Sequence, residues 1–494
     1  MTNFGAFTTI APFSLTVSDI VFRALRMTTI SSCDSTANII PYRRIFFKGM
    51  AVCTARFLFF LDFSSRSHYN FCMDFYKVRK LLPTDGFLET EVPASKSLLN
   101  RALILAAFGN GKTVLSCGDF ADDTLAMLDC LTALGITWSR TPNGLSIEGC
   151  NCCIPNQNAS LNVRSAGTAA RFLTVALAFA GGSYTMTASE QMQKRPMEIL
   201  SVLESAGVHI TYLGEHGHFP FLMQSDGIAE CDFTVNTDLS TQYASGLLLA
   251  SAVSRPIRLH LTGSRTHGSY IEMTLQLLER FGASWTRDGD TIDVSPSRQL
   301  PARIEIEADL SGACYFYALS LLMHMRVCIP RVHFDTLQGD LAFLRLLEEK
   351  GVLLNDTPDG ILADGRNIPS FSGFDVNMRD FSDQALTIAA LAPFATSESH
   401  ITGIGHIRRQ ECDRIHAIVT NLKKLDITAE EEPDGVRIFP GTPTAATLPT
   451  FDDHRVAMAF SLVGLKTGNV TIENPLCCKK TFANFFEILD QLTK

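Results

Sequence analysis

The segment at residues 93–101 places positive charge at the start of an apolar helix. It reads PASKSLLNR, and the apolar run ALILAA follows at once. Ser95 suits the N-cap position, and a helix N-terminus already carries partial positive charge and free N–H groups. Lys96 and Arg101 are therefore unfavourable there unless an anion is bound among them. The pattern predicts a binding site for a phosphate or a carboxylate.

Polar helix starts of this kind recur along the chain. They occur at residues 164–171, 240–242, 383, 411–414, 453–455 and 479–481, each close ahead of an apolar segment. A single one is weak evidence, because Ser, Thr and Asp at a helix start are ordinary caps. Their recurrence predicts several helix N-termini that converge on a shared anionic ligand.

Length and composition indicate a multidomain protein with an acidic body. The chain has 494 residues, of which 46% are hydrophobic, and a formal net charge of −9. A chain of this length is expected to divide into two or more domains. A nucleic-acid-binding protein would show a basic face overall, so the cations named above are local features.

The cysteines predict neither a zinc site nor a disulfide framework. No C-x-x-C pair among the 14 cysteines has a second half, and a chain of this size needs no disulfides. The longest apolar run is far shorter than a membrane span, and no signal peptide is evident. We therefore expect a cytoplasmic protein without a metal.

A leucine pattern recurs at an interval of about 70 residues, longer than the usual solenoid unit. Each copy has an apolar residue three positions before the leucine, and the first four copies have a glycine four positions after it. The leucines are Leu131, Leu203, Leu278, Leu347, Leu422 and Leu492. The pattern predicts six helices with a core-facing stripe, most with a glycine C-cap, each leading into a strand. Six such α/β units divide naturally into two groups of three.

Residues 1–72 show no trace of this repeat. They are basic and rich in Ser, Thr and Phe, but Asp19, Asp34 and Asp62 fit a transit peptide poorly. We interpret the segment as a disordered extension or as sequence translated ahead of the true start. Met73 is then the preferred initiator.

Several motifs, in order and spacing, resemble those of the 5-enolpyruvylshikimate-3-phosphate (EPSP) synthase family. They are PASKSxxNR from Pro93, AGTAxR from Ala166, MxxRP from Met192, STQ from Ser240, YIEMT from Tyr270, ExDR from Glu411, DHRxAM from Asp453 and KTF from Lys480. The resemblance covers about residues 73–494. Two of the motifs look like the forms found in bacterial members of the Bacteroidetes type.

The resemblance implies an α/β fold of two similar domains, each with three repeated βαβαββ units. The leucine repeat agrees with this independently. We expect one domain to span residues 93–307 and the other to combine residues 73–92 with 308–494.

The resemblance also implies an activity. Members transfer the enolpyruvyl group of phosphoenolpyruvate to the 5-hydroxyl of shikimate 3-phosphate and release phosphate, in the shikimate pathway to chorismate and the aromatic amino acids. It implies two small-molecule substrates, no cofactor, and no nucleic-acid or membrane partner. A monomer is expected.

Roles of individual residues follow from the matched motifs. Asp383 is implied as the base near the 5-hydroxyl, Glu411 as the proton donor, and Lys96 as a catalytic group beside both substrates. The implied phosphoenolpyruvate site comprises Lys96, Gly167, Arg195, Gln242, Arg414, Arg455 and Lys480. The implied shikimate 3-phosphate site comprises Lys96, Ser97, Arg101, Ser240, Thr241, Gln242 and Asp383.

The chain also departs from the family pattern at several positions. Gln410 stands where the family has Lys, and His406 stands where Asn is usual. The segment beginning at His267 replaces one that holds a phosphate-binding Ser. Further departures are Arg164 for Gly, Ser165 for Asn and Gln191 for Arg. Arg408 or Arg409 could supply the charge that is missing at position 410.

Two alternatives remain open at this point. One is the related enolpyruvyl transferase that acts on UDP-N-acetylglucosamine, which would use a loop cysteine as its acid and lack the ExDR and DHR motifs. The other is a catalytically weakened relative that binds shikimate-like anions, an idea motivated by Gln410 and His267.

A truncated chain that begins at Met73 tests the interpretation of the leader. We expect it to fold and to keep full activity, because no repeat or site motif lies in residues 1–72. Solubility and phosphate release, measured beside the full chain, check this. Loss of either property on truncation would contradict the interpretation.

Overall fold

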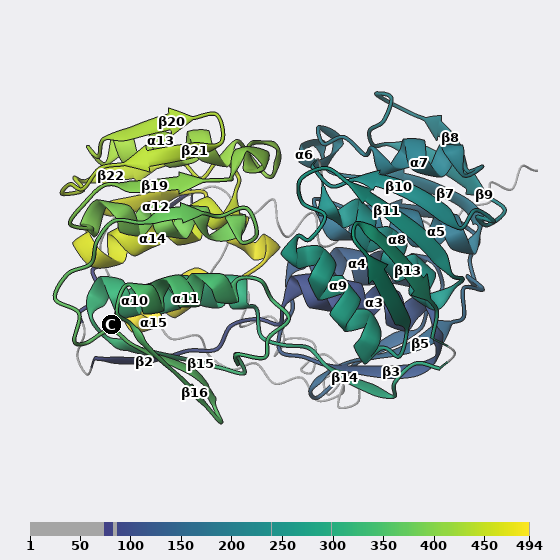
Figure 1. Cartoon of the computed structure of the whole chain (residues 1–494), viewed down its shortest axis with the longest axis horizontal. Coiled ribbons are helices and arrows are strands. Elements are labelled where there is room, and N and C mark those ends of the chain that lie inside the picture. Colours follow the sequence, from purple (N-terminus) through teal and green to yellow (C-terminus); the bar gives the residue numbers. More distant parts are fainter. Residues whose placement is uncertain (1–73, 83–85, 239, 298, 494) are drawn as a thin grey trace, which may run out of the picture. The chain divides into compact units, whose positions relative to one another are not determined.

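The computed structural model describes residues 74–82, 86–238, 240–297 and 299–493 (Figure 1). The interpretations of residues 1–72 and of Met73 lie outside these ranges. None of the described helices combines the length and apolarity needed to cross a membrane.

Buried apolar residues form two separate clusters, which define two lobes. The core of lobe 1 runs from Ala94 to Ile306, and the core of lobe 2 comprises Tyr76 to Val92 together with Ala308 to Leu489. The chain thus passes twice between the cores, and Ala94 and Ala308 pair there in an antiparallel bridge. Whether the lobes are domains with the expected boundaries stays a prediction.

Lobe 1 contains three four-stranded sheets. In sheet order, the first consists of β14 (Arg303–Glu305), β3 (Asn110–Ser116), β5 (Gly144–Cys150) and β4 (Trp138–Thr141). The second consists of β6 (Asn158–Asn162), β7 (Gly182–Thr187), β9 (Phe221–Ser225) and β8 (His209–Tyr212). The third consists of β10 (Asp232–Asn236), β11 (Ile257–Thr262), β13 (Thr291–Ser295) and β12 (Ser284–Asp288). In each sheet the first pair is parallel and the others are antiparallel.

Lobe 2 repeats this pattern of pairing. Among the described residues, its first sheet consists of β2 (Phe87–Glu89), β15 (Arg326–Pro330), β17 (Gly360–Asp364) and β16 (Leu353–Thr357). The second consists of β18 (Asp375–Asn377), β19 (Ser399–Thr402), β21 (Gly435–Ile438) and β20 (Ala429–Glu432). The third consists of β22 (Ala446–Leu448), β23 (Val470–Glu473) and β1 (Phe75–Lys77). Because β1 completes the last sheet, the two ends of this region are joined within one unit.

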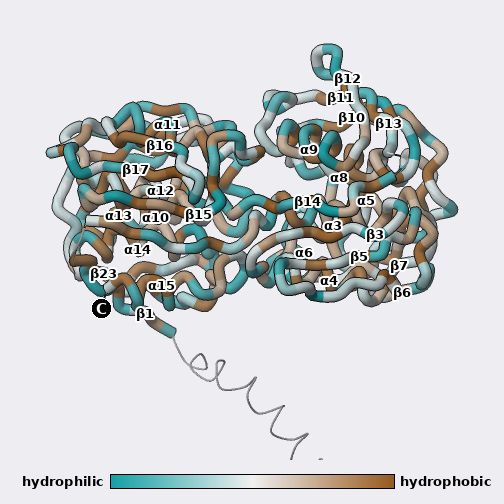
Figure 2. Tube along the Cα trace, turned by 90° about the horizontal axis from the view of Figure 1, so that it is seen from below, coloured by the Kyte–Doolittle hydropathy of each residue, from teal (hydrophilic) through white to brown (hydrophobic). Residues whose placement is uncertain are grey.

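Six helices are apolar on nearly every face and lie inside the lobes, as expected for helices surrounded by other elements (Figure 2). They are α3 (Lys96–Phe108), α5 (Gly167–Ala180) and α8 (Thr241–Val253) in lobe 1, and α10 (Leu310–Met323), α12 (Ala385–Leu391) and α14 (His454–Thr467) in lobe 2. The first three pack on one another, as do the second three.

The helices predicted from the leucine repeat are also present. They are α4 (Asp122–Ala133), α7 (Ile199–Ser205), α9 (Ser269–Arg280), α11 (Leu341–Glu349), α13 (Arg414–Lys424) and α15 (Phe485–Leu492). All of the repeat leucines except the partly buried Leu492 are fully buried. The four predicted cap glycines have positive φ, between 78° and 100°. The run from β10 to β13, with α8 and α9, has the order βαβαββ, so the expected fold class is confirmed.

Short helical turns complete the lobes. They are α6 (Glu190–Gln193), η1 (Ser382–Gln384), η2 (Ala392–Phe394), η3 (Gly405–Arg409) and η4 (Pro475–Lys480). One expectation was wrong here: residues 479–481 do not open the last helix. Pro475 instead starts a 3₁₀ turn that ends at Lys480, and α15 begins only at Phe485.

Two helix glycines offer a matched test of the packing. A methyl group on Gly464 in α14 would lie 2.5 Å from Cβ of Val78, whereas one on Gly246 in α8 would lie 3.2 Å from Cγ2 of Val175. Both Gly→Ala changes gain about 1 kcal/mol in helix propensity. We expect overpacking at Gly464 to cost about 1–3 kcal/mol.

Gly464→Ala should therefore lower the midpoint of thermal unfolding, while Gly246→Ala should leave it unchanged or raise it. Differential scanning fluorimetry of the two variants beside the parent measures this. Equal midpoints for the two variants would mean that Val78 does not pack on α14 as described.

Candidate functional site

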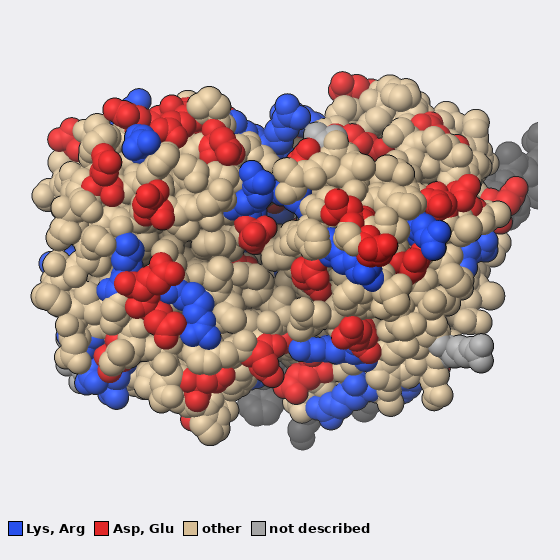
Figure 3. Space-filling view, in the orientation of Figure 1, with Lys and Arg blue, Asp and Glu red and all other residues tan. Residues whose placement is uncertain are grey.

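A polar cavity of about 170 Å³ is lined by residues of both lobes. The starts of α3, α5 and α8 contribute from lobe 1, and Asp383, residues 409–411, Arg414 and the start of α14 contribute from lobe 2. In Figure 3, Lys and Arg side chains gather in the hollow between the lobes. The predicted convergence of helix N-termini is thus present.

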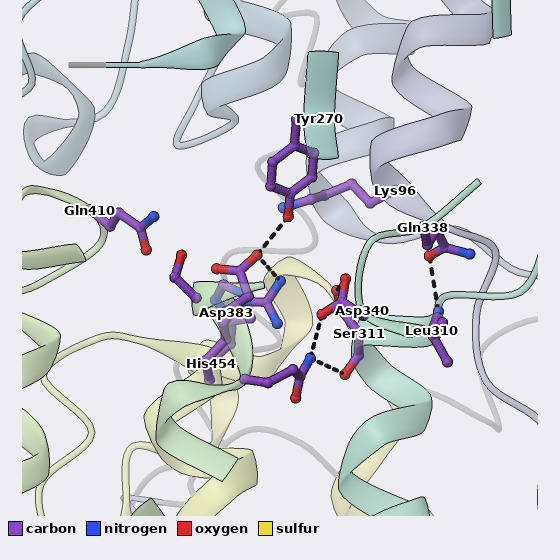
Figure 4. A network of polar contacts seen from close by, with 12 residues as sticks. Lys96, Tyr270, Leu310, Ser311, Gln338, Asp340, Asp383, Gln410 and His454 are labelled. Carbon is purple, nitrogen blue, oxygen red and sulfur yellow. Dashed lines mark hydrogen bonds and ion pairs between the residues drawn. The ribbon is translucent and has the colours of Figure 1, made fainter. Parts of the chain in front are cut away.

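Asp383 is one of two buried carboxylates in the site. Its Oδ1 lies 2.9 Å from Nη1 of Arg414, and its Oδ2 lies 2.9 Å from Nη2 of Arg455. The Tyr270 hydroxyl donates to Oδ2 at 2.7 Å, across the lobes (Figure 4). Burial would raise the pKa of Asp383, but the two arginine charges and the Tyr270 hydrogen bond outweigh it and lower the pKa to about 2. Asp383 is therefore ionised at neutral pH.

Glu411 is the second carboxylate. Its Oε1 lies 2.9 Å from Nζ of Lys480 and 3.5 Å from Nη2 of Arg195, and its Oε2 lies 3.0 Å from Nη2 of Arg414. Burial opposes ionisation, but these three cations prevail and hold the pKa of Glu411 well below its usual value. The cations suited to an anionic ligand are thus partnered by protein carboxylates here.

Buried polar atoms that lack a hydrogen bond mark the part of the site between α5 and α8. Among the described residues, Nε and Nη2 of Arg195 and Oε1 of Gln242 are buried without a hydrogen bond. A methyl group on Gly167 would lie 2.8 Å from Nη1 of Arg171 and 3.7 Å from Oε1 of Gln242. Buried polar groups normally find partners, so these atoms indicate a polar ligand beside Gly167.

The start of α3 contributes two cations with different surroundings. Nζ of Lys96 lies 3.2 Å from Oδ2 of Asp123 at the cavity wall. Arg101 is buried deeper, and its Nε donates to Thr274 Oγ1 and its Nη1 to Ser97 O, both at 2.8 Å. Burial lowers the pKa of Arg101 to about 10. Several of its donors therefore already bind protein atoms that join α3, α8 and α9.

A buried network fixes the element that carries Asp383. Nε2 of Gln384 donates to Oδ1 of Asp340 at 2.7 Å, and the Ser311 hydroxyl donates to Oδ2 at 2.9 Å (Figure 4). Oε1 of Gln338 accepts from the backbone N–H of Leu310 at 3.0 Å. The network ties η1 to the start of α10, so Asp383 is held from two sides.

His454 opens α14 behind the carboxylates. Both of its ring nitrogens are buried without a hydrogen-bond partner among the described residues. Burial, with the nearby Arg455 charge, lowers the pKa of His454 well below its usual value, so its ring is neutral. No described group of three or more His, Cys, Asp or Glu side chains is placed to hold a metal ion.

The departures from the family pattern have different environments. Oε1 of Gln410 accepts from Arg414, so the side chain faces the carboxylate cluster. Nε2 of His406 lies 2.9 Å from the Ser382 hydroxyl, and burial, followed by the Arg265 charge, lowers its pKa to about 4. His267 is 67% exposed and does not line the cavity.

One further departure affects the backbone, and the suggested compensation by Arg408 concerns the charge balance. Arg164, where the family has Gly, has φ of 51°, a conformation that glycine adopts without cost. Nη1 of Arg408 lies 3.0 Å from Asp413 and 2.7 Å from Glu431. The suggestion that Arg408 supplies the missing charge is therefore wrong, because its guanidinium is already paired away from the cavity.

Most of the expected site residues line the cavity. They are Lys96, Ser97, Arg101, Gly167, Arg195, Ser240, Thr241, Gln242, Asp383, His406, Gln410, Glu411, Arg414 and Arg455. Lys480 joins through Glu411. The expectations did not include Asp123, Arg265, Arg379 and Asp380, which also line it. No motif signalled them: Arg265, Arg379 and Asp380 lie on connections whose paths are set by the tertiary fold, and Asp123 lies in the first turn of α4. The substrate roles stay predictions.

Comparison with known proteins places these features in one family. The family model for EPSP synthase (3-phosphoshikimate 1-carboxyvinyltransferase) matches residues 85–489. A 3-phosphoshikimate 1-carboxyvinyltransferase 2 of Halalkalibacterium halodurans is 38% identical over 427 residues, covering 84% of this chain and 94% of that protein. A 3-phosphoshikimate 1-carboxyvinyltransferase of Nostoc punctiforme is 35% identical over 419 residues, covering 83% and 97%.

A solved structure has the same fold. The EPSP synthase from Acinetobacter baumannii matches with a TM-score of 0.70 at 22% identity, covering 85% of this chain and 98% of that one. With the family model spanning both lobes, and relatives above 30% identity covering more than two thirds of each chain, the protein belongs to the EPSP synthase family.

Proposed function

We propose that this protein transfers the enolpyruvyl group of phosphoenolpyruvate to the 5-hydroxyl of shikimate 3-phosphate and releases phosphate. The observation that carries the proposal is the pair of buried carboxylates, Asp383 and Glu411, that share Arg414 in a cavity with surplus cations. Family membership and the names of the relatives support the same reaction.

Proton transfer is assigned to the two carboxylates. The reaction needs an acid that protonates the vinyl carbon and a base that takes the hydroxyl proton, and both reverse roles when the tetrahedral intermediate loses phosphate. Asp383 is ionised, so it can accept a hydrogen bond from the 5-hydroxyl and then its proton. Glu411 is assigned as the proton donor, and Lys96, which lines the same cavity, is assigned as a catalytic group beside both substrates.

Glu411 can serve as an acid only if its pKa rises when substrate binds. Lys480, Arg195 and Arg414 hold its pKa low in this structure. Phosphoenolpyruvate brings a phosphate and a carboxylate, which are the groups that arginine binds in bidentate fashion. When these anions take over Arg195 and Lys480, Glu411 loses two of its three cationic partners and gains negative neighbours, so its pKa rises.

The remaining assignments come from the matched motifs, and the lining of the cavity supports them. Phosphoenolpyruvate is placed against the atoms of Arg195 and Gln242 that lack a hydrogen bond, the backbone at Gly167, and Arg455. Shikimate 3-phosphate is placed at Ser97, Ser240 and Thr241, next to Asp383. We further propose that the lobes are domains, residues 93–307 and residues 73–92 with 308–494, in a monomeric cytoplasmic enzyme.

The alternative reaction on UDP-N-acetylglucosamine is not favoured. It would require a loop cysteine as the acid. Cys412, the cysteine next to Glu411, donates to Oδ2 of Asp453 at 3.6 Å, and burial raises the pKa of its thiol. Cys412 is therefore positioned as a neutral thiol behind the cluster.

Replacement of Glu411 tests the assigned proton donor. The wild-type protein should release phosphate from phosphoenolpyruvate only when shikimate 3-phosphate is present. Glu411→Gln should still bind both substrates but lower turnover by about 100-fold or more, the scale of a lost general acid. Glu430→Gln, an exposed carboxylate on β20, is the matched control and should behave as wild type. A Glu411→Gln variant within a few-fold of wild type would remove Glu411 from this role.

Glu411 should also contribute to the number of protons that the protein takes up when phosphoenolpyruvate binds. Phosphoenolpyruvate binding should take up more protons in the wild type than in Glu411→Gln, because only the wild type has a carboxylate whose pKa rises on binding. Calorimetric titrations in two buffers of different ionisation enthalpy give the number of protons. Equal uptake by the two proteins would contradict the proposed shift.

A further inference from the structure

A buried hydrogen-bond network in lobe 2 adjoins Asp383. Its members are Ser311, Gln338, Asp340 and Gln384, and each is less than a tenth exposed. None of these four residues lines the cavity of about 170 Å³. Any effect of the network on the reaction must therefore pass through Asp383, the residue next to Gln384.

Asp340 does not cap the helix that follows it. It stands at the N-cap of α11, but its side chain accepts no hydrogen bond from that helix. Its Oδ1 instead accepts from Nε2 of Gln384 at 2.7 Å, and its Oδ2 accepts from the Ser311 hydroxyl at 2.9 Å (Figure 4). Both carboxylate oxygens are thus directed at elements other than α11.

The Gln384 side chain is held in one orientation. Its Nε2 also donates to Ser311 O at 3.3 Å, and its Oε1 accepts from the Thr387 hydroxyl of α12 at 2.9 Å. The residue is completely buried. A turned amide would set its oxygen against a carboxylate oxygen of Asp340, because a carboxylate accepts but does not donate. Gln384 therefore links α12 to the connection before α11 in a fixed geometry.

Gln338 fixes the start of α10, which carries Ser311. Its Oε1 accepts from the Leu310 N–H at 3.0 Å, and its Nε2 donates to Ala308 O at 2.8 Å. Gln338 and Asp340 lie on the same connection before α11. The network thus joins the starts of three helices, α10, α11 and α12, and it fixes the backbone of η1 within lobe 2.

The direct partners of Asp383 belong to the site itself. Arg414 and Arg455 each bind one of its carboxylate oxygens, and Tyr270 donates to it from lobe 1. In the proposed reaction, anionic substrates compete with Asp383 for both arginines. Once the substrates hold these cations, only the Tyr270 hydroxyl remains of the three partners. The network is then the main constraint on Asp383 from its own lobe.

A buried carboxylate at position 340 is unfavourable for packing alone. Burial raises the pKa of Asp340, and the Asp383 charge raises it further, against the Arg455 charge and the hydrogen bonds of the network. Burying a carboxylate costs free energy that an apolar side chain of similar size does not cost. The cost indicates that this position serves orientation.

We propose that Asp340 and Gln384 are positioning residues that hold η1, so that the Asp383 carboxylate stays aimed at the 5-hydroxyl after the substrates have taken its arginine partners. The proposal rests on the proposed function, since it takes Asp383 as the base. Misplacing a reacting group by about 1 Å can lower a rate by about 100-fold. Loss of the hydrogen bond between the pair therefore acts on turnover and leaves substrate affinity nearly unchanged.

Removal and exchange of the pair test this. Gln384→Met keeps the length of the side chain and removes the donor to Asp340. Its turnover should fall by about 10- to 100-fold, while calorimetry should find both substrate affinities within a few-fold of wild type. The double variant Gln384→Glu with Asp340→Asn exchanges amide and carboxylate between the two positions, so it should turn over within a few-fold of wild type. Gln224→Met, at an exposed position on β9, is the matched control and should behave as wild type.

A second measurement follows the position of Asp383 without the reaction. Tyr270→Phe removes the hydroxyl that donates to Asp383. With phosphoenolpyruvate bound, it should lower the midpoint of thermal unfolding in the wild type and lower it less in Gln384→Met, because a displaced carboxylate no longer accepts from that hydroxyl. Equal lowering in both backgrounds would show that Asp383 has not moved and would overturn the proposal.

Each remaining outcome has a defined meaning. Unchanged turnover in Gln384→Met overturns the proposal, as does a similar loss in turnover and in both affinities, or an exchanged pair as slow as Gln384→Met. If Gln384→Met fails to fold, Ser311→Ala decides by the same criteria, because it removes the other donor to Asp340. A wild type that turns over both substrates, with unchanged turnover in the variants, refutes this inference alone. A wild type without turnover, in which the Tyr270→Phe effect still depends on Gln384, refutes the proposed reaction alone.

Discussion

The Arg414 guanidinium is the interaction on which the site depends. Its Nε lies 2.7 Å from Asp453, its Nη1 2.9 Å from Asp383 and its Nη2 3.0 Å from Glu411, and the side chain is 2% exposed. These carboxylates precede three different helices, so one side chain sets the relative positions of α12, α13 and α14. Removing one partner of a buried ion pair typically costs about 3–5 kcal/mol, because the remaining charge stays buried.

The cluster also explains how many cations can lie close together in one cavity that binds anions. Asp383 and Glu411 pair with Arg195, Arg414, Arg455 and Lys480, which reduces the repulsion among these four cations. Anionic substrates compete with these carboxylates for the same cations, and the exchange alters the pKa of the displaced group. Binding and preparation for proton transfer are thus one electrostatic event in the proposed mechanism.

The repeat architecture supplies the geometry that this event needs. Each lobe encloses three apolar helices, and the helices can be apolar on all sides because sheets and outer helices cover them. The helix N-termini that line the cavity carry partial positive charge. An N-terminus has room for a ligand only where the covering layer is open, which here is the hollow between the lobes.

The sequence by itself determined the repeated units, the buried leucine stripes, the glycine caps and most of the cavity residues, since these depend on local periodicity, capping and short motifs. It could not place Lys480, which ends a 3₁₀ turn rather than opening a helix, or exclude Arg408, whose partners Asp413 and Glu431 lie on separate elements. It also gave no signal for Arg265 or Arg379. Their position beside the cavity follows from where strands β11 and β18 end, and the ends of strands from different lobes meet only through the tertiary fold.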